Sequence, residues 1–244
     1  MRFQDLHVVV NAAGRGFGRT AAIAFADEGA VVHLAARDEA KARATADAIQ
    51  RRQGSGRAFA HRCDLTDPAS VRAFAAAVGE RTDRVDVLCN TGAMYLEAGD
   101  FLAASDEDVA ATVGAAVTGT VLTAKAFLPM LRRSDRPDIV NLVSTAGTPG
   151  HFRSGAHEAF YAAKAGQGGF SRTLSHRLRG EGIRVIGLYP PDFDAVDIDG
   201  GEWDSTERHP HRNLTTQSVL ETVFFAVGQP RDCFISAIEF EQAL

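Results

Sequence analysis

The chain has 244 residues, 45% of them hydrophobic and 23% charged, with a formal net charge of −5. This balance predicts one globular domain rather than a disordered chain, and the acidic charge argues against binding to nucleic acid or an anionic membrane. Three widely spaced cysteines exclude a disulfide framework and give no metal-ligand spacing, so we expect no metal site. With neither a signal-peptide pattern nor an apolar run of ~18 residues, we expect a cytoplasmic protein.

Short apolar segments alternate with segments of helical periodicity along the chain. The predicted strands lack polar alternation, as strands buried on both faces do. They span residues 7–10, 31–35, 57–62, 85–89, 139–143, 184–188 and 233–238. The predicted helices span residues 18–28, 39–52, 68–80, 106–131, 160–180 and 218–226. This alternation predicts a single-domain, Rossmann-type α/β fold over residues 1–244, with about seven strands in a doubly wound parallel sheet and helices on both faces.

One long segment, residues 192–215, interrupts the alternation. It carries aspartates, glycines, histidines and one tryptophan, and it has no clear periodicity. A long irregular segment at this place predicts either a lid over the substrate site or a solvated surface loop.

The turn after the first strand reads N-A-A-G-R-G-F-G from position 11 to position 18 and opens a helix. Glycines let the backbone approach a pyrophosphate, and the start of a helix offers free N–H groups and positive potential. The turn therefore predicts a dinucleotide site. Its predicted contacts are Asn11, Gly14, Arg15, Gly16, Phe17 and Gly18.

Two later segments strengthen this interpretation. Residues 139–144 read I-V-N-L-V-S, and residues 160–164 read F-Y-A-A-K. With the glycine turn, they resemble the short-chain dehydrogenase/reductase family, whose patterns are T-G-x-x-x-G-x-G, I-V-N-I-S-S and Y-x-x-x-K. The resemblance covers nearly the whole chain. It implies hydride transfer between a nicotinamide cofactor and a carbonyl or alcohol.

The resemblance also indicates which cofactor is used. Ala36 stands where NAD-preferring members carry an acid for the ribose 2′-hydroxyl, and Arg37 follows it. An arginine can bind a 2′-phosphate with two hydrogen bonds, and Arg15 adds a second cation, so we predict NADP(H). The other cofactor contacts that the resemblance implies are Asp64, Leu65, Asn90, Lys164 and Pro190.

The predicted catalytic residues are Ser144, Tyr161 and Lys164, but the proton donor is displaced. Phe160 stands at the family's catalytic tyrosine and has no exchangeable proton. On a helix, Lys164 lies ~40° to one side of Phe160 and ~60° to the other side of Tyr161. Tyr161 is therefore a candidate general acid, with a packing role as the alternative. Other candidate acids near the cleft are Tyr95, His151, His157 and Glu158.

Three functions remain open. The first is an NADP(H)-dependent reductase of a small apolar molecule, with a remodelled general acid. The second is a non-redox enzyme such as a dehydratase, cyclase or isomerase, and the third is an inactive binding or partner subunit. Ala116 stands where the family has an asparagine that anchors a proton-relaying water. This loss keeps the non-redox enzyme and the inactive subunit open as alternatives. Relatives form dimers and tetramers through the helices predicted over 106–131 and 160–180, so we expect a homo-dimer or homo-tetramer, or pairing with an active homologue.

Overall fold

The computed structural model describes residues 1–53 and 57–241, while residues 54–56 and 242–244 lie outside its described part. Within that part, seven parallel strands form one sheet in the order β3-β2-β1-β4-β5-β6-β7. Their bounds are β1 His7–Val10, β2 Val31–Ala36, β3 Ala58–Arg62, β4 Val87–Asn90, β5 Asp138–Leu142, β6 Arg184–Tyr189 and β7 Ala237–Glu239. The order reverses between β1 and β4, which creates the crevice where ligands bind in such sheets.

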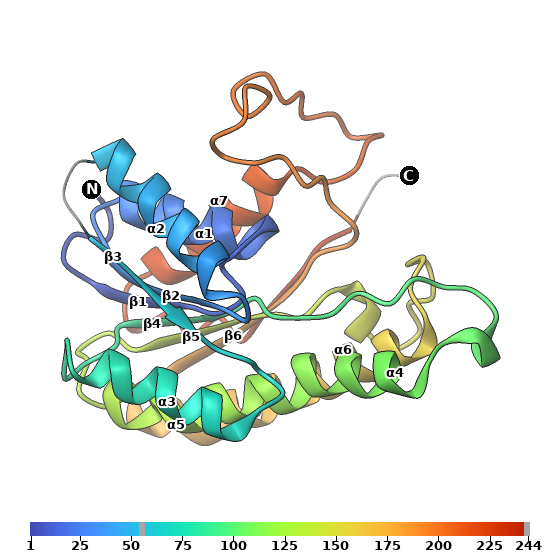
Figure 1. Cartoon of the computed structure of the whole chain (residues 1–244), viewed down its shortest axis with the longest axis horizontal. Helices are drawn as coiled ribbons and strands as arrows, with labels where there is room; N and C mark the ends of the chain where they lie inside the picture. The colour runs from blue at the N-terminus through green and yellow to red at the C-terminus, as the bar shows by residue number, and fades with distance from the viewer. Residues whose placement is uncertain (54–56, 242–244) are drawn as a thin grey trace.

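Helices cover both faces of the sheet (Figure 1). One face carries α1 (Gly16–Asp27), α2 (Glu39–Gln53) and α7 (Thr216–Gly228). The other carries α3 (Pro68–Gly79), α4 (Asp106–Val113), α5 (Gly119–Leu131) and α6 (Glu158–Leu178). Successive strand residues point to opposite faces, so Val8 and Val10 join the core under α1 and α7 while Val9 joins the core against α3 and α5. The predicted doubly wound parallel fold is confirmed.

Two predicted elements differ from the structure. The helix predicted over 106–131 is continuous, but Gly114–Thr118 form a π turn between α4 and α5. The strand predicted over 233–238 is wrong for residues 233–236, because β7 begins only at Ala237. Cys233 instead closes a turn, its N–H donating to Pro230 O and its carbonyl accepting from the buried Arg184 guanidinium. The backbone of Cys233 thus bonds to a turn and to a side chain instead of to β6, so the strand is shorter than its apolar sequence predicts.

By length and composition alone, the continuous helix Asp106–Leu131 would suffice to cross a membrane. In the structure it packs against α3 and α6 and contributes Phe127 and Leu131 to the core on that face of the sheet. Part of its apolar surface is therefore covered within the protein.

Residues 192–215 are irregular and rest on the α1 and α7 face (Figure 1). Arg19, in the first turn of α1, forms ion pairs with Asp197 and Asp199. Ile198 is buried in the core on that face, and Thr216 at the start of α7 bonds to Asp194. The segment is thus fastened close to the start of α1.

Candidate functional site

Asparagines stand at the carboxyl ends of three neighbouring strands, β1, β4 and β5. Asn11 donates through Nδ2 to Asn90 Oδ1 at 2.7 Å, and Asn90 donates to Asn141 Oδ1 at 2.8 Å. Asn141 donates to Ser171 Oγ at 2.9 Å, and that hydroxyl donates to the backbone carbonyl of Gln167 at 2.8 Å. We call these five buried residues the asparagine ladder. It connects the turn after β1 to α6.

The turn between β1 and α1 presents backbone donors without acceptors. The N–H groups of Gly16, Phe17 and Gly18 bond to no atom in the described part of the chain. Such a helix start favours a bound anion. A β-carbon on Gly18 would stand 2.6 Å from Ala12 O, so the close approach of helix and turn requires glycine here. This geometry fits the predicted pyrophosphate site.

Ala12 replaces the first glycine of the family's turn and has a φ of +51°. A left-handed conformation costs an alanine about 1 kcal/mol more than a glycine. The chain therefore retains the shape of the turn in spite of local strain.

Unpaired cations surround the end of β2. Arg15 and Arg37 are exposed and form no ion pair within residues 1–53 and 57–241. The same is true of Lys41, whose β-carbon lies beside Gly14, and of Arg62, which pairs with Ala36 in the sheet register. These two residues were not predicted from the sequence, because only the fold brings them to the end of β2.

Asp64 lies beside this group of cations. Partial burial acts to raise its pKa, but hydrogen bonds from Thr66 and the charges of Arg37 and Arg62 outweigh it, so the pKa is lowered. Leu65 packs where a β-carbon on Gly92 would stand, and this contact holds the β3–α3 connection against the β4 turn. Both predicted residues therefore line the same end of the crevice.

Lys164 is enclosed, with only 3% of its surface exposed. Its Nζ donates to Leu142 O at 2.8 Å and to Gln167 Oε1 at 2.9 Å. The same Nζ lies 5.5 Å from the centroid of the Phe160 ring. Burial lowers the pKa of Lys164 to about 7, because desolvation disfavours the ammonium.

The Tyr161 side chain has other partners within the described residues. Its hydroxyl donates to Ser154 O at 2.9 Å, and its ring contacts Phe152. Phe160 is buried and meets the Tyr95 ring edge-on, with the ring centroids 5.1 Å apart. The structure thus does not bring Tyr161 and Lys164 together, and a catalytic role for Tyr161 stays a prediction.

Ser144 follows β5 in a strained conformation. Its φ is +109°, which L-residues rarely adopt and which is concentrated at functional sites. Its Oγ accepts the Ala146 N–H at 3.2 Å, and the next residue, Thr145, donates its N–H to Pro190 O at 2.9 Å. Ser144 and Pro190 are therefore held together at the ends of β5 and β6, and the Ser144 hydroxyl proton is free to donate.

Gln167 was also missed by the sequence analysis, although a signal existed. It lies three residues after Lys164, so both side chains share one face of α6, and a polar residue there interrupts the buried face of the helix. Within the described residues, no group of three His, Cys, Asp or Glu side chains is placed to hold a metal ion. The residues present fit a dinucleotide, most completely at its phosphate end.

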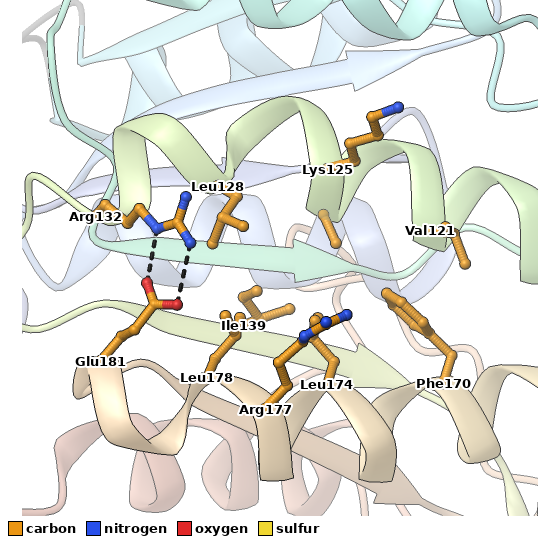
Figure 2. Close-up of a pocket in the computed structure, with 11 residues that line it drawn as sticks. Val121, Lys125, Leu128, Arg132, Ile139, Phe170, Leu174, Arg177, Leu178 and Glu181 are labelled. Atoms are coloured by element: carbon orange, nitrogen blue, oxygen red, sulfur yellow. Dashed lines mark hydrogen bonds and ion pairs between the residues drawn. The ribbon is translucent and has the colours of Figure 1, made fainter.

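A separate groove of about 450 Å³ lies between α5 and α6 (Figure 2). Leu128, Ile139 and Leu174 make its wall and floor apolar. At one end Arg132 donates to both carboxylate oxygens of Glu181, at 2.7 and 3.0 Å (Figure 2). None of the predicted cofactor or catalytic residues lines this groove.

The sequence was compared with known families and proteins. Residues 6–205 match the family model described as short chain dehydrogenase. Meso-2,3-butanediol dehydrogenase of Serratia marcescens is 35% identical over 191 residues, which cover 78% of this chain and 72% of that protein. Short-chain reductase protein NovJ of Streptomyces niveus is 29% identical over 246 residues, which cover 96% and 90% of the two chains.

Solved structures show the same fold. A metagenomic short-chain oxidoreductase in complex with NADP superposes with a TM-score of 0.80 at 25% identity, over 100% of both chains. An alcohol dehydrogenase from Thermococcus sibiricus, complexed with 5-hydroxy-NADP, gives a TM-score of 0.82 at 21% identity and covers 98% and 97% of the two chains. With the family match over most of its length, the chain belongs to the short-chain dehydrogenase/reductase family of oxidoreductases.

Proposed function

We propose that this chain is an NADP(H)-dependent reductase of a carbonyl on a small apolar molecule, with a displaced general acid. The observation that supports the cofactor preference is the group of exposed cations at the end of β2 that form no ion pair among the described residues, namely Arg15, Arg37, Lys41 and Arg62. A 2′-phosphate adds negative charge and acceptor oxygens, which arginine binds through paired hydrogen bonds. NADH lacks that phosphate and would leave these cations without a partner.

The chemistry follows from the residues at the ends of β5 and β6. When bound, NADPH would supply the hydride. Ser144, whose Oγ accepts the Ala146 N–H and keeps its own proton, would donate a hydrogen bond to the substrate oxygen. Lys164 is buried beside the Phe160 ring, so we assign it no direct proton transfer to substrate. The proton comes from a phenol beside the cleft, which we assign to Tyr161. The rings of Tyr95, Phe152 and Phe160 make the surroundings apolar.

Calorimetric titration of the purified protein with NADPH and NADH tests the cofactor assignment. We expect NADPH to bind at least tenfold more tightly, and equal affinities would remove the support for NADP(H). The next step is a ketone screen followed by Tyr161→Phe and Tyr95→Phe. Loss of turnover in Tyr161→Phe supports the assigned acid, whereas loss only in Tyr95→Phe moves that role to Tyr95. Product formation without NADPH consumption would identify a non-redox enzyme.

One observation favours a second candidate, a cofactor-binding subunit without reductase activity. The Phe160 ring centroid lies 5.5 Å from Lys164 Nζ, and this ring lacks the phenol that would stand beside the amine. This candidate predicts tight NADPH binding, no turnover with any ketone, and co-purification of an active homologue. Turnover by the isolated chain excludes it.

We also propose that the chain forms a homo-oligomer through the groove between α5 and α6. The groove is apolar along its floor, and a second copy would present the same apolar helices to it. Leu174→Arg would place a charge in the middle of this surface, near the Arg177 cation (Figure 2). Light scattering should then show monomers where the unchanged protein shows dimers or tetramers. A monomeric wild-type protein would reject the proposal.

A further inference from the structure

The side chain of Gln167 is held at both ends. It is fully buried on α6, and its Oε1 accepts from Lys164 Nζ at 2.9 Å. Its Nε2 donates to the hydroxyl of Thr120 on α5, also at 2.9 Å. Reversing the amide would turn its NH₂ group toward the lysine ammonium, which can only donate, so Lys164 selects this orientation, while the Thr120 hydroxyl can bond to either end of the amide.

Lys164 depends on this acceptor. Its other partner is the backbone carbonyl of Leu142, and the Phe160 ring is uncharged. No carboxylate forms an ion pair with Lys164 within the described residues. A buried ammonium that lacks a counter-ion must be stabilised by hydrogen bonds. Ala116, buried on the π turn, supplies no polar group, so Gln167 is the side chain that does so.

We infer that Gln167 is a positioning residue that fixes both the place and the charge of the Lys164 amine. Its backbone carbonyl is also the last acceptor of the asparagine ladder, so the amine is held in register with the turn after β1. That Lys164 contacts a cofactor rests on the proposed function, whereas the hydrogen bond between Lys164 and Gln167 is present in the chain alone.

The charge of Lys164 can be followed directly, because Lys41, Lys125 and Lys164 are the three lysines of the sequence. Lysine labelled with ¹³C at Cε gives a separate NMR signal for each, and Lys164→Arg assigns its own. We expect Gln167→Met, which keeps the length but removes the acceptor, to lower the pKa of Lys164 by about one pH unit. Gln167→Glu should raise it, because a carboxylate favours the ammonium. Ser175→Ala, buried further along α6, is the matched control and should change nothing.

A second readout connects the contact to the cofactor. Gln167→Met should weaken NADPH binding about tenfold and shift its pH profile in the same direction as the amine titration, while Gln167→Glu should restore binding near neutral pH. If Gln167→Met does not fold, Thr120→Val keeps the glutamine but frees its amide, and a smaller shift of the same sign is expected. Unchanged Lys164 titration in these variants overturns the inference. A wild-type protein that binds no NADPH overturns the proposed function instead, and the amine titration still decides the role of Gln167.

Discussion

The two ends of the crevice present their basic residues in opposite ways. At the end of β2, Arg15 and Arg37 are exposed and form no ion pair in the part of the chain that the structure describes. At the end of β5, Lys164 is enclosed by a backbone carbonyl, an amide and the Phe160 ring. The first arrangement is suited to capture an anion, and the second removes a side chain from contact with substrate. In the proposed function, the two ends of the crevice would therefore serve different purposes, with anion capture at one end and a buried amine at the other.

Restoring the phenol should produce the largest effect. Phe160→Tyr would put a hydroxyl on the ring that lies against Lys164, and a positioned general acid contributes ~10²–10⁴ in rate. We expect kcat for ketone reduction to rise by that order, measured by NADPH oxidation. Tyr161→Phe in the same background should then have no effect. A Phe160→Tyr protein with unchanged kcat would show that the missing phenol is not what limits this end of the crevice.

Removing one cation tests the other end. Arg37→Ala should weaken NADPH binding about tenfold or more, because a charge-assisted hydrogen bond contributes about 1.5–3 kcal/mol, while NADH binding should not change. The matched control is Arg43→Ala on α2, where Arg43 is already paired with Glu39. Calorimetry with both cofactors measures the difference. Equal losses for NADPH and NADH would mean that Arg37 does not recognise the 2′-phosphate.

The buried His33 limits the pH range in which NADPH binding by variants at the two ends of the crevice can be compared. His33 is fully buried between the rings of His7 and Phe59, and burial, assisted by the charge of His7, lowers its pKa from 6.5 to about 3. Below pH 6.5 the unfolded chain binds a proton at His33 that the folded chain does not. The free energy of unfolding should therefore fall by up to about 1.4 kcal/mol per pH unit until the folded pKa is reached.

Urea unfolding at several pH values measures that slope. His33→Leu has no group to protonate and should make the slope shallower by about one proton. An unchanged slope would assign the acid sensitivity to His7, His61 or other groups, since burial lowers the pKa of those two histidines as well. NADPH binding by variants at the two ends of the crevice is best compared above pH 6.5, where protonation of His33 in the unfolded chain no longer lowers stability.

The smallest expected effect concerns the strained turn. Ala12→Gly relieves a φ of +51° and should raise the free energy of unfolding by about 1 kcal/mol, measured by denaturant unfolding. Because the turn already has its shape, NADPH affinity should stay within a factor of about three. A much larger gain in NADPH affinity would mean that Ala12 impairs phosphate binding at the glycine turn. Both ends of the crevice would then be impaired, and the contrast between them would be lost.

The sheet could be predicted because its signal is local. The apolar runs around Val8, Leu34 and Ile186 contain no polar alternation, and strands buried on both faces leave that pattern. The end of a strand is harder to predict, as Cys233 shows, because its hydrogen bonds go to a turn and to a guanidinium remote in sequence.

The site was predictable only where its residues lie within a motif. Each of three predicted parts of the site lies in a short contiguous motif: the glycine turn, the segment that ends at Ser144 and the segment that ends at Lys164. The glycine turn follows β1, Ser144 follows β5, and Lys164 of α6 bonds to Leu142 O at the end of β5. Lys41 and Arg62 come from different elements, so no spacing in the sequence indicates them. The direction of the Tyr161 hydroxyl likewise depends on Ser154, in a loop whose path the sequence does not specify.

The asparagine ladder has a consequence for how substitutions combine. From Asn11 through Asn90, Asn141 and Ser171, every side chain donates in the same direction, so their dipoles add and each bond polarises the next. Residues linked in this way show non-additive energies. Changes at Asn11 and at Asn141 should therefore cost less together than the sum of their separate costs. Evolution at one end of the crevice is thus constrained by the sequence already present at the other.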